Sequence, residues 1–256
     1  MTNKAQHNGK RVSVIIPTYR DDAALQGLLR QLQGLDVFEI IIIDGEGRRS
    51  LPPVFERAAH IIWSCAPRGR GPQIAHGLSR ARGDYLWVLH ADAVVHPRSL
   101  FEIHHVLKVS STALGMFRLS FNHPRRAYRL FEWFARLDMP LSSFGDQGFF
   151  FRKDALMQLP SLLGQLTAAP ILEDVILRKG LKSLGRVKKS RHKIGTSPRR
   201  FERHGLWRMQ FINAVILFKA RLGTPADVLY RNYYRPPATS IVSHLENEMS
   251  GSPELS

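Results

Sequence analysis

Two acidic residues follow apolar runs closely on the C-terminal side, at positions where a parallel sheet would place ligand-binding side chains. Asp92 closely follows residues 85–89, and Asp44 follows residues 38–43. The run 85–89 does not alternate with polar residues, which is typical of a strand buried on both faces of a parallel sheet. Ligands bind at the carboxyl ends of such strands, and a carboxylate there suits Mg²⁺ or Mn²⁺ beside a phosphorylated ligand. The alternative is a strand followed by an ordinary polar loop.

Further charged residues stand at predicted helix starts. Glu173 and Asp174 open one helix, and the basic, glycine-rich loop that contains Arg68 and Arg70 leads into another. A helix N-terminus beside two arginines suits an anion. The alternative for Glu173 and Asp174 is that they only stabilise a helix N-terminus through the macrodipole.

The elements that must position these residues alternate between strand and helix. The run 12–17 predicts a first strand that is stopped by Pro17, and leucines at helical spacing predict a helix behind it. Alternation up to residue 92 predicts an α/β fold with a doubly wound, mainly parallel sheet and helices on both faces. The remaining predicted elements are strands at 38–43, 60–63, 113–121 and 149–152, helices at 73–81, 124–137, 173–184, 198–222 and 226–234, and a basic extended segment at 186–193.

Length and composition exclude several classes of protein. The 256 residues suffice for one sizeable α/β domain, which we expect over residues 11–235. Residues 1–10 and 236–256 are predicted to be disordered. Cys65 is the only cysteine, so neither an intramolecular disulfide nor a cysteine zinc site can form. We expect a cytoplasmic protein, because the first apolar run is too short for a signal peptide and the apolar stretch 209–218 is far below the ~20 residues of a membrane span.

The net charge of +16 predicts an anionic partner: a nucleotide diphosphate, an acidic lipid surface or nucleic acid. No nucleic-acid module is recognisable, so nucleic-acid binding is not predicted. The positive charge is concentrated in the C-terminal third, which contains Lys179, Lys182, Arg186, Lys188, Lys189, Arg191, Lys193, Arg199, Arg200 and Arg203.

The order of these features resembles family 2 glycosyltransferases of the GT-A fold, over residues 12 to about 233. The resemblance is strongest to the bacterial branch whose acidic motif is His-Ala-Asp, matched here by His90-Ala91-Asp92. The other matching residues are Gly69-Arg70 with Gln73 and Gly77, Gly145-Asp146-Gln147, Glu173-Asp174, Thr196-Ser197, Arg199-Arg200-Phe201-Glu202 and Gly205.

The resemblance implies an inverting transfer of a sugar from a nucleotide-diphosphate sugar to an acceptor hydroxyl, assisted by Mg²⁺ or Mn²⁺. Residues 11–110 would bind the donor, residues 111–197 the acceptor, and residues 198–235 would form basic amphipathic helices. Asp92 would hold the metal, and Asp174 would act as general base with Glu173 and Asp146 beside it. The donor would be bound by Pro17, Tyr19, Asp44, Gly45, Arg70, Gln73, Arg199 and Arg200.

Arg48 and Arg49 depart from this pattern, because the family has an acid in this loop. The departure leaves an alternative open: a non-catalytic relative that binds an anionic partner or membrane surface through its basic C-terminal third. The retained acids Asp92, Asp146 and Asp174 favour the enzyme.

The C-terminal helix offers two further alternatives. Leu206, Met209, Ile212, Val215 and Ile216 share one face, and Trp207, Phe211 and Phe218 widen it. Such a helix can pack on its own domain or lie on an anionic membrane surface, which would suit a lipid-linked acceptor. Donor sugar, acceptor and oligomeric state are not determined by the sequence.

Overall fold

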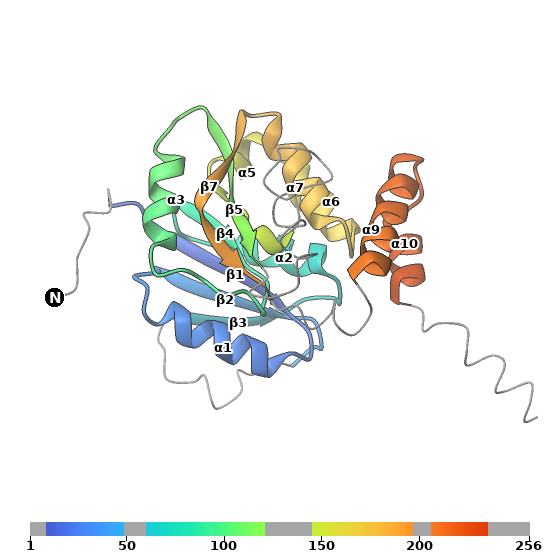
Figure 1. The fold of residues 1–256 in the computed structure, drawn as a ribbon, viewed down its shortest axis with the longest axis horizontal. Helices are drawn as coiled ribbons and strands as arrows, with labels where there is room; N and C mark the ends of the chain where they lie inside the picture. The colour runs from blue at the N-terminus through green and yellow to red at the C-terminus, as the bar shows by residue number, and fades with distance from the viewer. Residues whose placement is uncertain (1–8, 49–59, 121–144, 197–205, 235–256) are drawn as a thin grey trace, which may run out of the picture.

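The computed structural model describes residues 9–48, 60–120, 145–196 and 206–234. Within these ranges the chain forms one seven-stranded sheet with the order β3-β2-β1-β4-β6-β5-β7 (Figure 1). β6 runs antiparallel to β4 and β5, whereas the other pairs are parallel. The strands are β1 (Val12–Thr18), β2 (Glu39–Asp44), β3 (Ile61–Cys65), β4 (Tyr85–Val88), β5 (Thr112–Ser120), β6 (Phe150–Arg152) and β7 (Arg186–Gly195).

Helices cover both faces of the sheet, which confirms the predicted fold class. One apolar cluster joins the sheet to α1 and α3, and a second joins its other face to α2, α6 and α7. The helices of the described ranges are α1 (Asp22–Leu32), α2 (Arg70–Arg80), α3 (Ser99–Leu107), α5 (Ala155–Gln158), α6 (Leu162–Ala168), α7 (Glu173–Lys182), α9 (Leu206–Arg221) and α10 (Ala226–Tyr234), with a 3₁₀ turn η3 at Gly145–Gln147. None of these helices is long and apolar enough to cross a bilayer.

β2 shows why the apolar runs are continuous. Ile40 and Ile42 point to the cluster that contains α1, whereas Ile41 and Ile43 point to the cluster that contains α2. Successive side chains of a strand alternate between faces, and both faces are covered here, so all four positions from 40 to 43 are apolar. The continuous apolar run that predicted a parallel sheet therefore arises because a layer of helices covers each face of the sheet.

Several predicted boundaries were wrong. β1 is not stopped by Pro17 but continues to Thr18, with Pro17 opposite Ile43 of β2. Its missing N–H costs no hydrogen bond to β4, because the pairing with β4 ends at Ile15. α3 was not predicted, although the spacing of its buried residues Leu100, Ile103, Val106 and Leu107 is helical.

The start of α2 depends on tertiary contact. The helix begins at Arg70 rather than at the predicted Gln73, because the glycines on both sides of Arg70 let its backbone approach the end of α6. A Cβ on Gly71 would lie 1.9 Å from the carbonyl oxygen of Ala169, and Gly69 has a φ of 137°. Arg70 N–H donates to the carbonyl of Pro170 at 3.0 Å. This contact sets the N-terminus of α2 beside the segment that leads into α7.

The predicted basic extended segment 186–193 is confirmed as part of β7, which lies at the edge of the sheet beside β5. Charged side chains on an edge strand discourage pairing with another chain. The predicted helix 124–137, the predicted helix start at Ser197-Pro198 and the tail 236–256 lie outside the described residues.

Candidate active site

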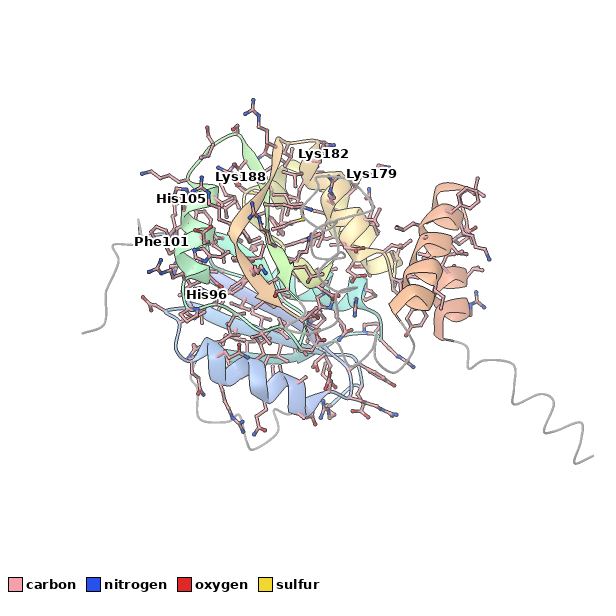
Figure 2. The ribbon with its side chains drawn as sticks, viewed as in Figure 1. His96, Phe101, His105, Lys179, Lys182 and Lys188 are labelled. Carbon is pink, nitrogen blue, oxygen red and sulfur yellow. The ribbon has the colours of Figure 1, made fainter. Side chains whose placement is uncertain are left out.

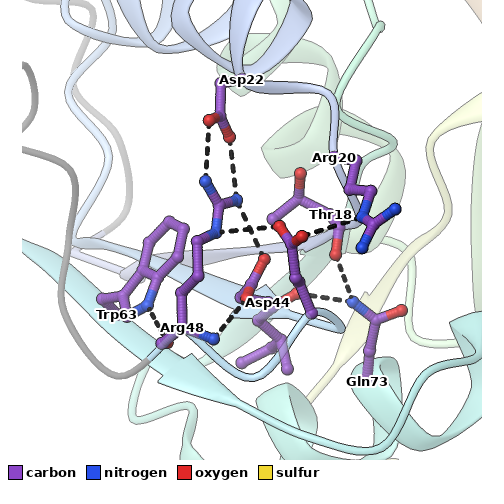
Figure 3. A network of polar contacts seen from close by, with 9 residues as sticks. Thr18, Arg20, Asp22, Asp44, Arg48, Trp63 and Gln73 are labelled. Carbon is purple, nitrogen blue, oxygen red and sulfur yellow. Dashed lines mark hydrogen bonds and ion pairs between the residues drawn. The ribbon is translucent and has the colours of Figure 1, made fainter.

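The candidate site lies where the carboxyl ends of β1, β2 and β4 meet the N-terminus of α2. Gln73 of α2 holds two of these strand ends together, since its Nε2 donates to the carbonyl oxygens of Thr18 and Ile43, both at 2.7 Å (Figure 3). The Gln73 side chain is buried, so it supports the site from inside the protein and is not exposed to solvent. Gly45 packs closely against this side chain, since a Cβ on Gly45 would be 3.0 Å from Gln73 Nε2.

Asp92 and Asp146 come together because β6 is antiparallel to β4. Trp87 pairs with Phe150, so the chain just before β6, which contains Asp146, lies beyond the carboxyl end of β4. Burial, followed by the charge of Asp146, raises the pKa of Asp92 above its usual value. His90 is buried, and its Nδ1 lies 3.7 Å from Asp146 Oδ1. The sequence alone could not show that these acids are neighbours.

The segment after Asp92 is fixed to the end of β7. Val94 and Gly195 exchange two backbone hydrogen bonds of 2.8 Å, and a Cβ on Gly195 would lie 2.8 Å from Val94 Cβ. Thr196 Oγ1 then lies 3.5 Å from Asp92 Oδ2. The carboxylate is therefore held between two strand ends that are far apart in the sequence.

Glu173 and Asp174 occupy the first turn of α7 but have different surroundings. Glu173 is 4% exposed, and its Oε1 lies 3.5 Å from Arg70 Nη1. Asp174 is half-buried, and its Oδ1 accepts the N–H of Val175 at 2.8 Å. Leu172, just before them, has a φ of 70°. A left-handed branched residue is rare and costly, and such strain clusters at functional sites.

Arg48 encloses Asp44 in a polar network (Figure 3). Asp44 has no exposed surface, and it accepts hydrogen bonds from the Arg48 backbone N–H at 2.9 Å and from Nη2 at 3.0 Å. The same guanidinium makes a two-point contact with Asp22 at 2.7 and 2.9 Å. This contact, by hydrogen bonding, lowers the pKa of Asp22, and both acids raise the pKa of Arg48. Trp63 Nε1 donates to the Arg48 carbonyl at 2.9 Å, which fixes the loop.

Replacing Arg48 with methionine is expected to destabilise the protein by about 2–3 kcal/mol, because the Asp44 carboxylate stays buried after its cation is lost. Urea unfolding measures the change. Arg30→Met, at an exposed position in α1, is the control and should stay within about 0.5 kcal/mol of the parent. Asp44→Asn should recover part of the loss in the double variant. An unchanged midpoint for Arg48→Met would contradict the structural role.

Arginines also surround Tyr19 at the mouth of the site. The guanidinium carbons of Arg68 and Arg20 lie 4.3 and 5.4 Å from the Tyr19 ring centroid. Arg68 is also 6.0 Å from the ring centroid of Tyr230, so α10 lies near this side of the site. Arg20 has a φ of 51°, a second left-handed position beside the site. Arg20 Nε is paired with Glu46 Oε1 at 2.8 Å, so the positive charge beside Tyr19 that an anionic ligand requires comes from Arg68.

The structure thus brings Asp92, Asp146, Arg70 and Glu173 together, with Asp174 next to Glu173 in the first turn of α7. It places Pro17, Tyr19, Asp44, Gly45 and Gln73 at the adjoining strand ends. Arg199 and Arg200 lie outside the described residues. Sequence reasoning missed the roles of Asp22 and Trp63 around Arg48. The sequence signal for this network was Arg48, four residues after Asp44, because a buried acid at a strand end requires a cation.

The family model for glycosyl transferase family 2 matches residues 13–158, which is more than half of the chain. The chain belongs to glycosyl transferase family 2. The match contains the strand ends that present Asp44 and Asp92, together with the start of α2 and η3. No curated protein sequence matches the chain.

Two solved structures, S. aureus TarS and a mannosyl-3-phosphoglycerate synthase, share the fold of this family member. S. aureus TarS, residues 1–349, is 12% identical with a TM-score of 0.57, over 90% of this chain and 74% of TarS. Mannosyl-3-phosphoglycerate synthase from Rubrobacter xylanophilus is 15% identical with a TM-score of 0.52, over 84% of this chain and 76% of the synthase. Glucosyl-3-phosphoglycerate synthase from Mycobacterium tuberculosis, solved with Mn²⁺, UDP and glucosyl-3-phosphoglycerate, is 17% identical with a TM-score of 0.49, over 74% of this chain and 71% of the synthase.

Proposed function

We propose that this family member transfers a sugar from a nucleotide-diphosphate sugar to an acceptor hydroxyl, with inversion at the sugar carbon. The observation that supports this proposal is the meeting of two charged pairs at one edge of the sheet. Asp92 and Asp146 form an acidic pair, and Arg70 and Glu173 form an ion pair beside it. Burial raises the pKa of Asp92, and Arg70 is close enough to offset part of that rise. A diphosphate needs positive charge, and a transfer needs a base nearby.

The acidic pair fits a divalent cation. Asp92 and Asp146 repel each other in a partly buried place, and a cation between them would offset that repulsion. Among the described residues no three acids, histidines or cysteines gather as a complete metal-binding group. Two carboxylates nevertheless suit Mg²⁺ or Mn²⁺, which keep waters and take further oxygens from phosphates. When bound, the cation would offset the charge of the departing diphosphate.

Asp174 is proposed as the general base. In the proposed step it takes the proton from the acceptor hydroxyl, whose oxygen attacks the sugar carbon from the side opposite the diphosphate. The bond from that carbon to the diphosphate oxygen breaks, and its electron pair leaves with the nucleoside diphosphate. Glu173 points to Arg70, so it positions the start of α7 rather than facing the acceptor. Arg199 and Arg200 are proposed, from the family pattern, to bind the leaving diphosphate.

The nucleoside is proposed to lie over β1 and β2, against Tyr19 and the loop that follows Asp44. Asp44 itself is enclosed by Arg48 and Asp22. The nucleoside would therefore contact Arg48, and Asp44 would act by holding that side chain in place.

The test is thermal stabilisation by a panel of nucleoside diphosphates, each with Mn²⁺ or with EDTA. One of them, at about 100 times its dissociation constant, should stabilise the protein by about 2.7 kcal/mol. EDTA should remove most of the effect. Absence of stabilisation by every nucleotide would favour the non-catalytic relative, which binds an anion elsewhere on its basic C-terminal third.

A further inference from the structure

The outer face of α9 is apolar where a surface helix is expected to be polar. Ala214, Phe218 and Leu222 follow one another at intervals of four residues, so they lie along one line of the helix and its end. Phe218 is 63% exposed and Leu222 is 70% exposed. Ile212 and Ile216 are half-buried on the other side, so α9 is apolar on both sides. The sequence placed Phe218 at the edge of an apolar face that could pack on the domain or meet a membrane surface, and the fold leaves this side chain exposed.

α9 and α10 form a hairpin whose turn holds Leu222 in the exposed position. The carbonyls of Phe218 and Lys219 accept hydrogen bonds of 3.1 Å from Leu222 N–H and Thr224 N–H, and Gly223 has the φ of 86° that this turn needs. Figure 1 shows the hairpin at one end of the molecule, beside α6 and away from α1 and α3. The hairpin thus presents large apolar side chains on a fixed support.

Positive charge borders this apolar line. Lys219 is exposed between Phe218 and Leu222. Residues 206–234 contain four basic residues and one acid, Asp227, which is paired with Arg231. Lys179 and Lys182 of α7 are exposed on the same upper side of the view as the hairpin turn (Figures 1 and 2). A basic surface with protruding Phe and Leu side chains suits an interface between anionic headgroups and acyl chains.

We propose that the α9–α10 hairpin docks on an anionic membrane surface by inserting Phe218 and Leu222 among the lipids while Lys219 contacts the headgroups. A second copy of this chain fits less well, because it would bring two strongly basic surfaces together. Nucleic acid fits less well too, since Leu222 offers its phosphates and bases neither charge nor a stacking ring. The proposal does not depend on the chemistry proposed above.

The experiment is sedimentation of the full chain with vesicles of phosphatidylcholine, with or without phosphatidylglycerol. The parent protein should sediment only with the anionic vesicles and should be released by high salt. Phe218→Ser and Leu222→Ser should each lower the partition coefficient about tenfold. Phe101→Ser is the matched control, because Phe101 is 50% exposed on α3 at the opposite end of the molecule (Figure 2) and should leave binding unchanged. Circular dichroism verifies that each variant keeps its helices.

Four results would overturn the proposal. The first is no sedimentation with either vesicle. The second is equal loss of binding in Phe101→Ser, which would indicate a non-specific effect of apolar surface. The third is a change from dimer to monomer in Phe218→Ser, which would assign the surface to a second copy. The fourth is binding to an oligonucleotide in preference to vesicles, which would assign it to nucleic acid.

Discussion

Asp174→Asn is expected to slow sugar transfer by about 10²- to 10⁴-fold, which is the usual contribution of a positioned general base. Asparagine has nearly the same shape, and its side-chain oxygen can still accept the hydrogen bond from Val175 N–H. It cannot take the proton of an acceptor hydroxyl. Donor binding should be retained, because the side chain lies on α7 rather than at the ends of β1 and β2. Single-turnover rates and nucleotide dissociation constants, measured on the same samples, separate the two effects.

Asp154→Asn is the control for this substitution. Asp154 is also an acid at a helix N-terminus, but it is exposed and precedes α5. Its replacement should leave the rate unchanged, which excludes a general effect of losing an acid beside a helix. If Asp174→Asn weakened donor binding as much as transfer, the residue would be part of the donor or metal site and not the base.

Asp92→Asn is expected to abolish Mn²⁺-dependent transfer and yet to stabilise the metal-free protein by about 1 kcal/mol, or about 2–4 °C in Tm. Burial, and then the charge of Asp146, raises the pKa of Asp92, so the ionised carboxylate destabilises the fold at neutral pH. Asparagine removes that charge. Mn²⁺ should stabilise the parent protein and leave the variant unchanged, as calorimetry and thermal unfolding can measure.

The same pKa shift predicts how metal binding depends on pH. A raised pKa means that protons compete with the cation at a higher pH than for an ordinary aspartate. Mn²⁺ affinity should therefore fall early as the solution is acidified, while the penalty of the charged pair in the metal-free protein disappears over the same range. Asp36→Asn, at an exposed loop position, is the control. Equal Mn²⁺ affinity in Asp92→Asn and the parent would refute the metal assignment.

The sequence determined the strands of the N-terminal half and the class of the fold. The runs that became β1, β2 and β4 are apolar at nearly every position because two helical layers cover them, and that pattern is local. It also determined that Asp44 and Asp92 would stand at or near strand ends, because each follows an apolar run. These inferences need only the order of the residues.

Tertiary structure decided which of these acids is available to a ligand. The antiparallel pairing of β6 with β4 brings Asp146 beside Asp92, and no local pattern encodes a pairing between segments about sixty residues apart. Arg48 buries Asp44 by reaching Asp22 on another element, which only the folded backbone makes near.

The exposed face of α9 was decided in the same way. Helical spacing shows which residues share a side, but which side is covered depends on where the rest of the chain packs. The sequence therefore grouped Phe218 with the apolar face of its helix, and only the fold shows that this side chain is exposed.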